Sequence, residues 1–290
     1  MTKLSSLLLM VVIAVVASYG TMRFVDRGNP SVSQSAVKES TYDRIMRTRT
    51  LRCSYLIWPP YMNRDVTTGK LSGVYYDLLE RMGKDWAVKI DWVEEVGAAN
   101  RFEGFKTGRY DLLCSPTGGT AERTAVSDFS IPFVYESFYL YARVGDTRFD
   151  NSYEKLNDEH MTLVTQDGYM GAIITKSEFP RAKLSSLPEL SSNIEILTNV
   201  EMGKADAAVC DASMGYDFMR NNQGKIKRVS GHPLRVAGET IPFPIGEDRL
   251  RSKINTTLTY YLDSGVIEKI LTANGLTADK VLRVAKPYAE

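Results

Sequence analysis

The sequence is poor in the two side chains that most often hold metal ions or transfer protons at neutral pH. It has only two histidines and three cysteines among 290 residues. His160 and His232 lie near none of the cysteines, and the cysteine spacings match no zinc-ligand pattern. We therefore expect neither a metal site nor a cofactor.

A strong net charge is also absent. The 36 basic and 35 acidic side chains leave a formal charge of +1, and no basic cluster interrupts the chain. Nucleic-acid binding depends on such a cluster, so we exclude nucleic acid as a partner. The hydrophobic fraction of 43% is that of an ordinary globular protein, and the length permits two domains.

An apolar segment stands at the N-terminus. Lys3 precedes an uninterrupted apolar run over residues 7–17, followed by small residues that suit cleavage. Counted over residues 4–22, the segment approaches the roughly 20 residues of a membrane span. No cysteine follows it, which argues against lipid modification. We predict export to the periplasm, with residues 1–22 acting as a cleaved signal peptide or as a retained inner-membrane anchor.

Export bears on Cys53, Cys114 and Cys210, because an oxidising compartment favours disulfides and an odd number leaves one thiol over. All three lie in apolar, strand-like contexts. Two interpretations stay open: buried thiols that pack as small hydrophobes, or a disulfide between Cys53 and Cys114.

The rest of the chain alternates short apolar strands with helical periodicity, which indicates an α/β fold. A polar, aperiodic stretch comes first, and we assign residues 23–48 as a linker. A long strand at 135–143 would lead to a second lobe, and a strand at 241–245 would lead back. The predicted bounds are 49–140 with 238–290 for lobe 1, and 141–237 for lobe 2.

Two similar blocks mark corresponding points of the two lobes. Residues 108–111 read Gly-Arg-Tyr-Asp and residues 203–206 read Gly-Lys-Ala-Asp, and each block leads into an apolar strand. The first polar residue after these strands is Ser115 in one lobe and Asp211 in the other. Ligands of open α/β sheets bind at the carboxyl ends of the strands, so we expect both side chains to face a shared cleft.

Arg123 carries the clearest chemical signal. Thr120 fits a helix N-cap, which places Arg123 in the first turn of a predicted helix, where a cation opposes the macrodipole. Binding of an external anion would explain a cation at this position. Free backbone N–H groups, the two glycines Gly118 and Gly119, and the guanidinium of Arg123 together form a carboxylate site. The alternative is a surface arginine that pairs with Glu122 or Asp128.

Asp211 has the complementary chemistry, since a carboxylate after a strand can accept hydrogen bonds from an ammonium group. Its alternative is the N-cap of the helix that follows. Together Arg123 and Asp211 predict a receptor for a zwitterion. Trp58 offers a flat face to a ligand or packs in the core, and Tyr55 and Tyr169 are weaker candidates of the same kind.

The chain resembles the bacterial extracellular solute-binding proteins of the polar amino-acid type, which feed ABC importers. The residues that carry the resemblance, over about 50–275, are Leu51-Arg52, Pro59-Pro60-Tyr61, Gly69-Lys70-Leu71-Ser72-Gly73, Asp77-Leu78-Leu79, Gly108-Arg109-Tyr110-Asp111, Thr120-Ala121-Glu122-Arg123, Asp128-Phe129-Ser130-Ile131-Pro132-Phe133 and Lys204-Ala205-Asp206-Ala207-Ala208 through Asp211. It implies a type II fold of two lobes, each a mixed sheet flanked by helices, joined by a two-strand hinge.

The resemblance also implies roles for single residues. Arg123 would hold the ligand's α-carboxylate and Asp211 its α-amino group. Ser115 and Thr117 would form hydrogen bonds with the ligand, and Trp58 would flank it as an aromatic wall. Gly168 and Tyr169 would form the turn of the second lobe that receives the carboxylate. The chain departs from the family pattern at three positions: Gly118 replaces a hydroxyl, Ala98 a second aromatic residue, and Tyr169 a threonine.

Three classes of function follow. We expect extracytoplasmic binding of an amino acid or similar small zwitterion by lobe closure, with delivery to an ABC permease. The second class is a membrane-tethered sensory or accessory module that is not coupled to transport. The third is an enzyme on the same fold, for which Glu136 or Glu239 would be the general acid. No carboxylate pair is evident in the sequence, so we expect no catalytic residues.

Overall fold

The computed structural model describes residues 14, 39–150, 152–229 and 231–285. Apart from Ala14, the predicted signal or anchor segment lies outside the described residues, as does most of the predicted linker. No described helix combines the length and the apolar character that crossing a membrane requires. The chain divides into Met1–Glu39 and Ser40–Glu290. All helices and strands named below belong to the second unit.

The last part of the predicted linker is a helix, which corrects that assignment. Helix α2 spans Thr41–Thr48, and Ser40 caps it by accepting a hydrogen bond from the Asp43 N–H at 3.0 Å. Only Ile45 of this helix is buried. Tyr42 and Met46 are partly buried against the core beside it, but eight residues are too few to show a clear helical period, so the sequence pattern indicated a linker.

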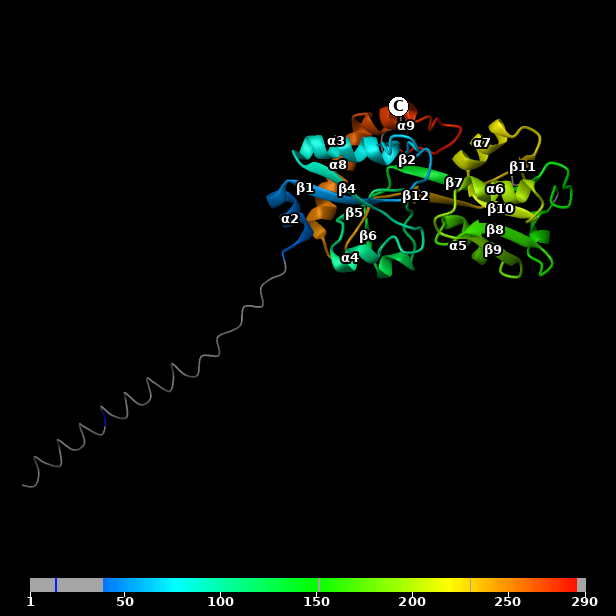
Figure 1. Cartoon of the computed structure of the whole chain (residues 1–290), viewed down its shortest axis with the longest axis horizontal. Helices are drawn as coiled ribbons and strands as arrows, with labels where there is room; N and C mark the ends of the chain where they lie inside the picture. The colour runs from blue at the N-terminus through cyan, green and yellow to red at the C-terminus, as the bar shows by residue number, and fades with distance from the viewer. Residues whose placement is uncertain (1–13, 15–38, 151, 230, 286–290) are drawn as a thin grey trace, which may run out of the picture. The chain divides into compact units, whose positions relative to one another are not determined.

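The first sheet has the strand order β4-β1-β5, and both pairings are parallel. Its strands are β1 (Thr50–Tyr55), β4 (Lys89–Glu95) and β5 (Leu112–Leu113). The helices of this lobe are α3 (Val74–Trp86), α4 (Glu103–Thr107), α8 (Asp248–Asp263) and α9 (Val266–Ala273). A short hairpin of β2 (Asn63–Arg64) and β3 (Leu71–Ser72) precedes α3. We call this part of the molecule lobe 1 (Figure 1).

The second sheet has the order β11-β7-β10-β8-β9, with β12 also paired to β7. Its strands are β7 (Val134–Arg143), β8 (Thr162–Gln166), β9 (Lys183–Leu187), β10 (Ala207–Asp211), β11 (Ile226–Arg228) and β12 (Arg235–Glu239). The α-helices around it are α5 (Met170–Glu178), α6 (Ile194–Glu201) and α7 (Ala212–Asn221). We call this part lobe 2; the α/β class with two lobes of mixed sheet and helix is as predicted.

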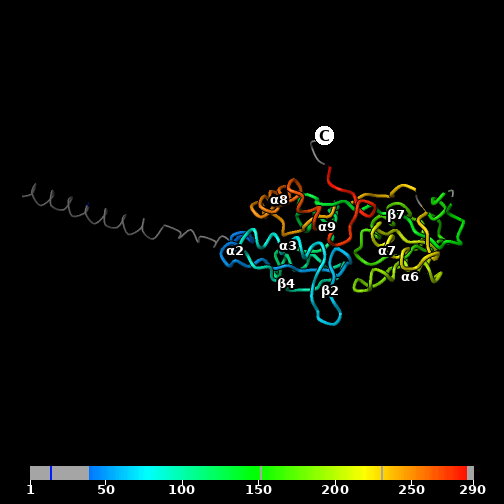
Figure 2. Tube along the Cα trace, turned by 90° about the horizontal axis from the view of Figure 1, so that it is seen from above, coloured from blue at the N-terminus to red at the C-terminus, as the bar shows by residue number. Residues whose placement is uncertain are grey.

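Two antiparallel pairings connect the lobes. The long strand predicted at 135–143 is β7, which runs beside β12 between the two groups of elements (Figure 1) and lies near α7 in the view from above (Figure 2). The returning chain differs from the expected single strand at 241–245. It leaves lobe 2 as β12 and then forms β13 (Pro242–Phe243), which pairs with β6 (Asp128–Phe129) in lobe 1. The predicted residue bounds of the lobes stay a prediction.

The aspartates of the two repeated blocks hold the sheets together. Asp111 accepts a hydrogen bond from the Arg52 N–H at 2.7 Å, and Asp206 accepts one from the Thr162 N–H at 2.9 Å. Each therefore joins the start of its own strand to the start of a parallel neighbour. Arginines neutralise both carboxylates: Arg52 at 2.8 Å for Asp111, and Arg148 at 2.6 Å for Asp206.

The cysteines resolve into one bridge and one thiol. A disulfide joins Cys53 on β1 to Cys114 after β5, with a Cα–Cα distance of 5.6 Å. Cys210 is free and buried in β10. Of the two interpretations left open by the sequence, the structure has the disulfide.

Reduction of this disulfide should destabilise the protein. The bridge closes a sequence separation of 61 residues. Removing such a constraint from the unfolded chain lowers the free energy of unfolding by about 2–4 kcal/mol. Urea unfolding with and without dithiothreitol measures the difference. A Cys210→Ala variant should show the same difference between the two curves as the wild type, and a Cys53→Ser/Cys114→Ser variant should show none. Wild-type curves that are identical with and without dithiothreitol would contradict the expectation.

Candidate functional site

A cavity of about 30 Å³ lies between the lobes. Six of the predicted site residues line it: Trp58, Thr117, Gly118, Arg123, Tyr169 and Asp211. The other lining residues are Leu56, Tyr61, Arg101, Pro116, Glu136, Phe138, Met170 and Glu239. Segments far apart in the sequence therefore meet at one site.

Arg123 is buried at this site, but not as part of a helix. The segment Arg123–Ala125 is a single 3-10 turn, so the argument from an α-helix macrodipole does not apply. Thr120 does cap the turn, since its Oγ1 accepts from the Arg123 N–H at 3.2 Å. The guanidinium donates to the carbonyl oxygens of Gly118 and Gly168, each at 2.8 Å. With 8% of its surface exposed, Arg123 is not the surface arginine of the alternative interpretation.

Arg101 is a second buried guanidinium that sequence reasoning missed. It donates to the Ala98 carbonyl at 2.6 Å, to Thr117 Oγ1 at 3.2 Å and to the Gly168 carbonyl at 3.0 Å. Burial, together with the charge of Arg123, lowers its pKa to about 9. It lies just before α4, and no local sequence pattern marks it as buried.

Neither arginine has a carboxylate within ion-pair distance among the described residues. Buried charges without a counter-ion are unfavourable, and desolvation lowers the pKa of Arg123 as well. The two guanidinium groups therefore carry positive charge that no direct ion pair balances, which favours an anion at this end of the cavity.

Gly168 contributes its carbonyl oxygen rather than a contact with the cavity. It has φ +75, and a Cβ atom here would lie 2.3 Å from the Ala98 carbonyl oxygen of lobe 1. Only glycine permits this approach, which brings the Gly168 carbonyl within reach of Arg101 and Arg123. The predicted site residue thus acts in the contact between the lobes.

Asp211 fills the N-cap position that the alternative interpretation gave it. Its Oδ1 accepts from the Met214 N–H at 2.8 Å and from the Ser213 hydroxyl at 2.7 Å. Its Oδ2 accepts from the Tyr169 hydroxyl at 2.7 Å. Both carboxylate oxygens therefore have partners within the protein.

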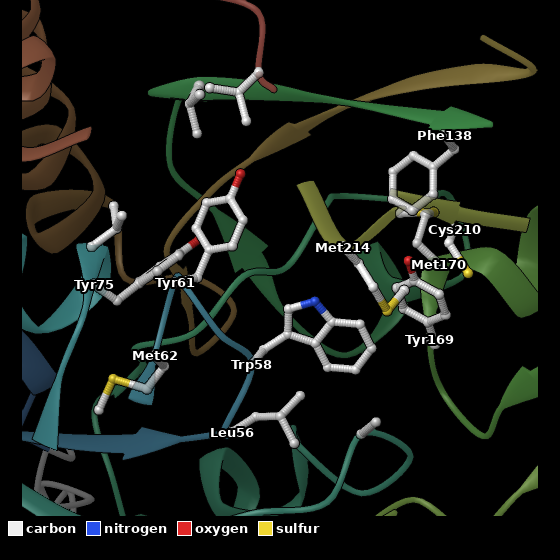
Figure 3. Packing of buried hydrophobic residues seen from close by; sticks show 14 of the residues in the cluster. Leu56, Trp58, Tyr61, Met62, Tyr75, Phe138, Tyr169, Met170, Cys210 and Met214 are labelled. Carbon is white, nitrogen blue, oxygen red and sulfur yellow. The ribbon is translucent and has the colours of Figure 1, made fainter. Parts of the chain in front are cut away.

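Aromatic side chains of the two lobes pack against each other at the cavity. The Trp58 and Tyr169 rings lie 4.7 Å apart between centroids and are inclined by 34°. The centroid of the Phe138 ring lies 6.0 Å from that of the Tyr169 ring. Figure 3 shows Trp58 facing Tyr169, with Met170 and Met214 beside this pair. The flat face predicted to meet a ligand is packed against a tyrosine.

Two glutamates line the same cavity. Glu136 and Glu239 have exposed fractions of 2% and 5%, and Oε2 of each has no hydrogen-bond partner among the described residues. Tyr61 donates its hydroxyl to the other oxygen of Glu136. The sequence interpretation found no carboxylate pair, but the structure brings these two together. They are distant in sequence, and only the pairing of β7 with β12 makes them neighbours.

Burial raises the pKa of both glutamates. The pKa of Glu239 rises to about 7, because desolvation outweighs the opposing effect of Arg123. The pKa of Glu136 lies well above its usual value, through desolvation and the charge of Asp211. Both carboxyls therefore hold a proton more tightly than an exposed glutamate does, and Glu239 is partly protonated at neutral pH.

Three predicted site residues differ from expectation in their surroundings. The Ser115 hydroxyl donates to the Leu56 carbonyl at 3.1 Å and does not line the cavity. Tyr55 also lies outside the lining and packs edge-on against Trp92, with 6.2 Å between centroids. Gly118 lines the cavity, but an added Cβ would lie 2.8 Å from the Met170 Cε. Met170 therefore occupies the space where a hydroxyl side chain was expected.

Two lobes joined by paired strands around a polar cavity define a binding protein of the type II periplasmic class. The chain belongs to the bacterial extracellular solute-binding proteins, family 3, because the model of this family matches residues 53–275.

Known relatives agree with this family. The chain is 24% identical to the probable amino-acid-binding protein YxeM of Bacillus subtilis over 213 residues, covering 70% of this chain and 75% of the relative. It is 29% identical to a probable histidine-binding protein of Campylobacter jejuni, covering 64% and 68%. Its fold is similar to an ancestral amino acid-binding protein, AncCDT-1, described as a precursor of cyclohexadienyl dehydratase, with a TM-score of 0.71, 24% identity, and 81% and 99% coverage.

The raised pKa of Glu239 predicts that the protein loses stability as pH rises. Between pH 4.5 and about 7 the folded state keeps a proton that the unfolded state has released. The free energy of unfolding therefore falls across this window, by on the order of 3 kcal/mol. A Glu239→Gln variant should show a flatter profile of melting temperature against pH. The exposed Glu159→Gln variant should follow the wild type, and an unchanged slope in Glu239→Gln would contradict the assignment.

Proposed function

We propose that the protein binds an amino acid or a similar small zwitterion in the cavity between its lobes. One observation carries this proposal: Arg101 and Arg123 are buried side by side and donate only to neutral oxygen atoms. A ligand carboxylate would supply the missing negative charge through charge-assisted hydrogen bonds. Carboxyl groups line the same cavity, so a positive group on the same ligand also has acceptors.

The names of the relatives support a binding role rather than catalysis. Two are described as probable binding proteins for amino acids, one of them for histidine. One protein of similar fold is described as a precursor of cyclohexadienyl dehydratase, so an enzyme on the same fold is the alternative. We assign no catalytic residue to this chain, because nothing in the cavity requires a reaction in order to explain its charges.

Lobe closure over the ligand would be the signal to a membrane partner. We propose that this partner is an ABC permease and that the protein works in the periplasm, in keeping with its family of extracellular proteins. A tethered sensory module is the alternative, and it depends on whether residues 4–22 stay attached.

An Arg123→Ala variant should lose most of its affinity for amino acids. Removing one charge-assisted contact of about 1.5–3 kcal/mol weakens binding by roughly 10- to 150-fold. The measurement is the ligand-induced shift in melting temperature across the common amino acids, dipeptides and organic acids, followed by calorimetric titration of the amino acid with the largest shift. The Arg123→Lys variant keeps the positive charge but lacks the two-pronged guanidinium, so its affinity for the amino acid should lie between that of the wild type and that of Arg123→Ala.

Arg181 provides a matched control, because it is an exposed arginine outside the cavity. Arg181→Ala should bind like the wild type. If Arg123→Ala keeps the full melting shift, Arg123 is not the carboxylate site. If no compound of the panel shifts the wild type, the zwitterion proposal itself fails.

The state of the N-terminus decides between a diffusing carrier and a tethered module. We expect the exported protein to begin near Ser18 or Thr21, as for a cleaved signal peptide. N-terminal sequencing of the protein from the periplasmic fraction tests this directly. Recovery of the chain with residues 4–22 intact, in membranes washed with high salt, would show a tether instead.

A further inference from the structure

Three carboxyl groups line the cavity, and they differ in what they already bond. Asp211 has protein donors on both oxygens, from the start of α7 and from Tyr169. Glu136 and Glu239 each keep one buried oxygen, Oε2, that has no hydrogen-bond partner in the part of the chain that the structure describes. Such an oxygen is unfavourable unless a donor reaches it, so these two glutamates have the stronger requirement for a ligand donor.

The sheet places the two glutamates close together on one face. In the antiparallel pairing of β12 with β7, Ala237 lies opposite Glu136, and Glu239 is two residues further along β12. Residues two apart on a strand point to the same side, and such diagonal neighbours lie on the order of 7–8 Å apart. Both side chains line the cavity. A single small donor group between them is within reach of both carboxyls.

Tyr169 explains why the expected acceptor is not available. Its hydroxyl donates to Asp211 Oδ2 and accepts from the Asp211 N–H at 2.9 Å. Its ring is fixed between Trp58 and Phe138, as Figure 3 shows. A ligand ammonium at Asp211 would have to share this carboxylate with the tyrosine.

We propose that Glu136 and Glu239, rather than Asp211, hold the ammonium group of the bound amino acid. This inference rests on the proposed function, because it presumes a zwitterion whose carboxylate lies at Arg123. The ligand would then lie with its negative end at the two arginines and its positive end at the two glutamates.

The charges around the glutamates support this arrangement. Glu239 interacts with Arg123, Arg101 and Asp211, and Glu136 interacts with Asp211 and is bonded by Tyr61. Burial raises the pKa of both carboxyls, that of Glu239 to about 7, so Glu239 is partly protonated near neutral pH in the unliganded protein. A bound ammonium favours their ionised forms, so binding should release protons.

The test compares the ligand's amine with each carboxyl in turn. The probes are the common L-amino acid with the largest melting shift and its 2-deamino analogue, in which hydrogen replaces the amine. For the amino acid, Glu136→Gln/Glu239→Gln should lower affinity by about tenfold or more, whereas the analogue should bind wild type and variant alike. Asp211→Asn should show a much smaller difference between the two probes. Glu159→Gln is the matched surface control.

A second measurement does not depend on the analogue's affinity. Calorimetric titration of the amino acid in buffers of different ionisation enthalpy counts the protons released on binding. The wild type should release protons near pH 7 and bind more tightly as pH rises from 5.5 to 7.5, and Glu239→Gln should reduce both effects. If Glu136 and Glu239 had only a structural role, neither the proton release nor the pH dependence of the affinity would be observed.

The outcomes separate this inference from the proposed function. If no amino acid shifts the wild type, or if Arg123→Ala binds normally, the proposed function fails. If the wild type binds an amino acid but Asp211→Asn carries the amine-dependent loss and the glutamate variant does not, only the present inference is overturned.

Discussion

Two buried guanidinium groups converge on one carbonyl oxygen, and the arrangement of the lobes depends on this contact. Arg101 and Arg123 come from lobe 1, and both donate to Gly168 in the turn after β8 of lobe 2. The turn can approach only because position 168 has no side chain. The bonds satisfy some of the guanidinium donors but leave the charges uncompensated. The same residues therefore join the lobes and require an anion.

The aromatic contact beside it follows from the same approach of the lobes. Trp58 and Tyr169 stack across the cavity, and Tyr169 also bonds the Asp211 carboxylate. One tyrosine thus fills space, caps a carboxylate and narrows the site.

The fold was largely predictable because local rules and burial agree along most of the chain. Gly108 ends α4 with φ 67, the left-handed conformation that glycine adopts most readily after a helix. The inward-facing aromatic strand at 135–143 appeared as β7. The errors fall where little apolar surface marks the structure, as in α2, or where a short turn replaces a helix, as at Arg123. Cys53 and Cys114 could be paired only as one of two interpretations.

By itself the sequence determined the α/β class and the two-lobed family, and it singled out Arg123 and Asp211, which both line the cavity, because these depend on local periodicity and position. The tertiary structure decided which of the charged side chains at the cavity already have hydrogen-bond partners within the protein. It buried Arg101, bonded Asp211 to Tyr169, and brought Glu136 beside Glu239 through the pairing of two distant strands. Whether a polar atom has a partner depends on neighbours far away in the chain, and no local pattern contains that information.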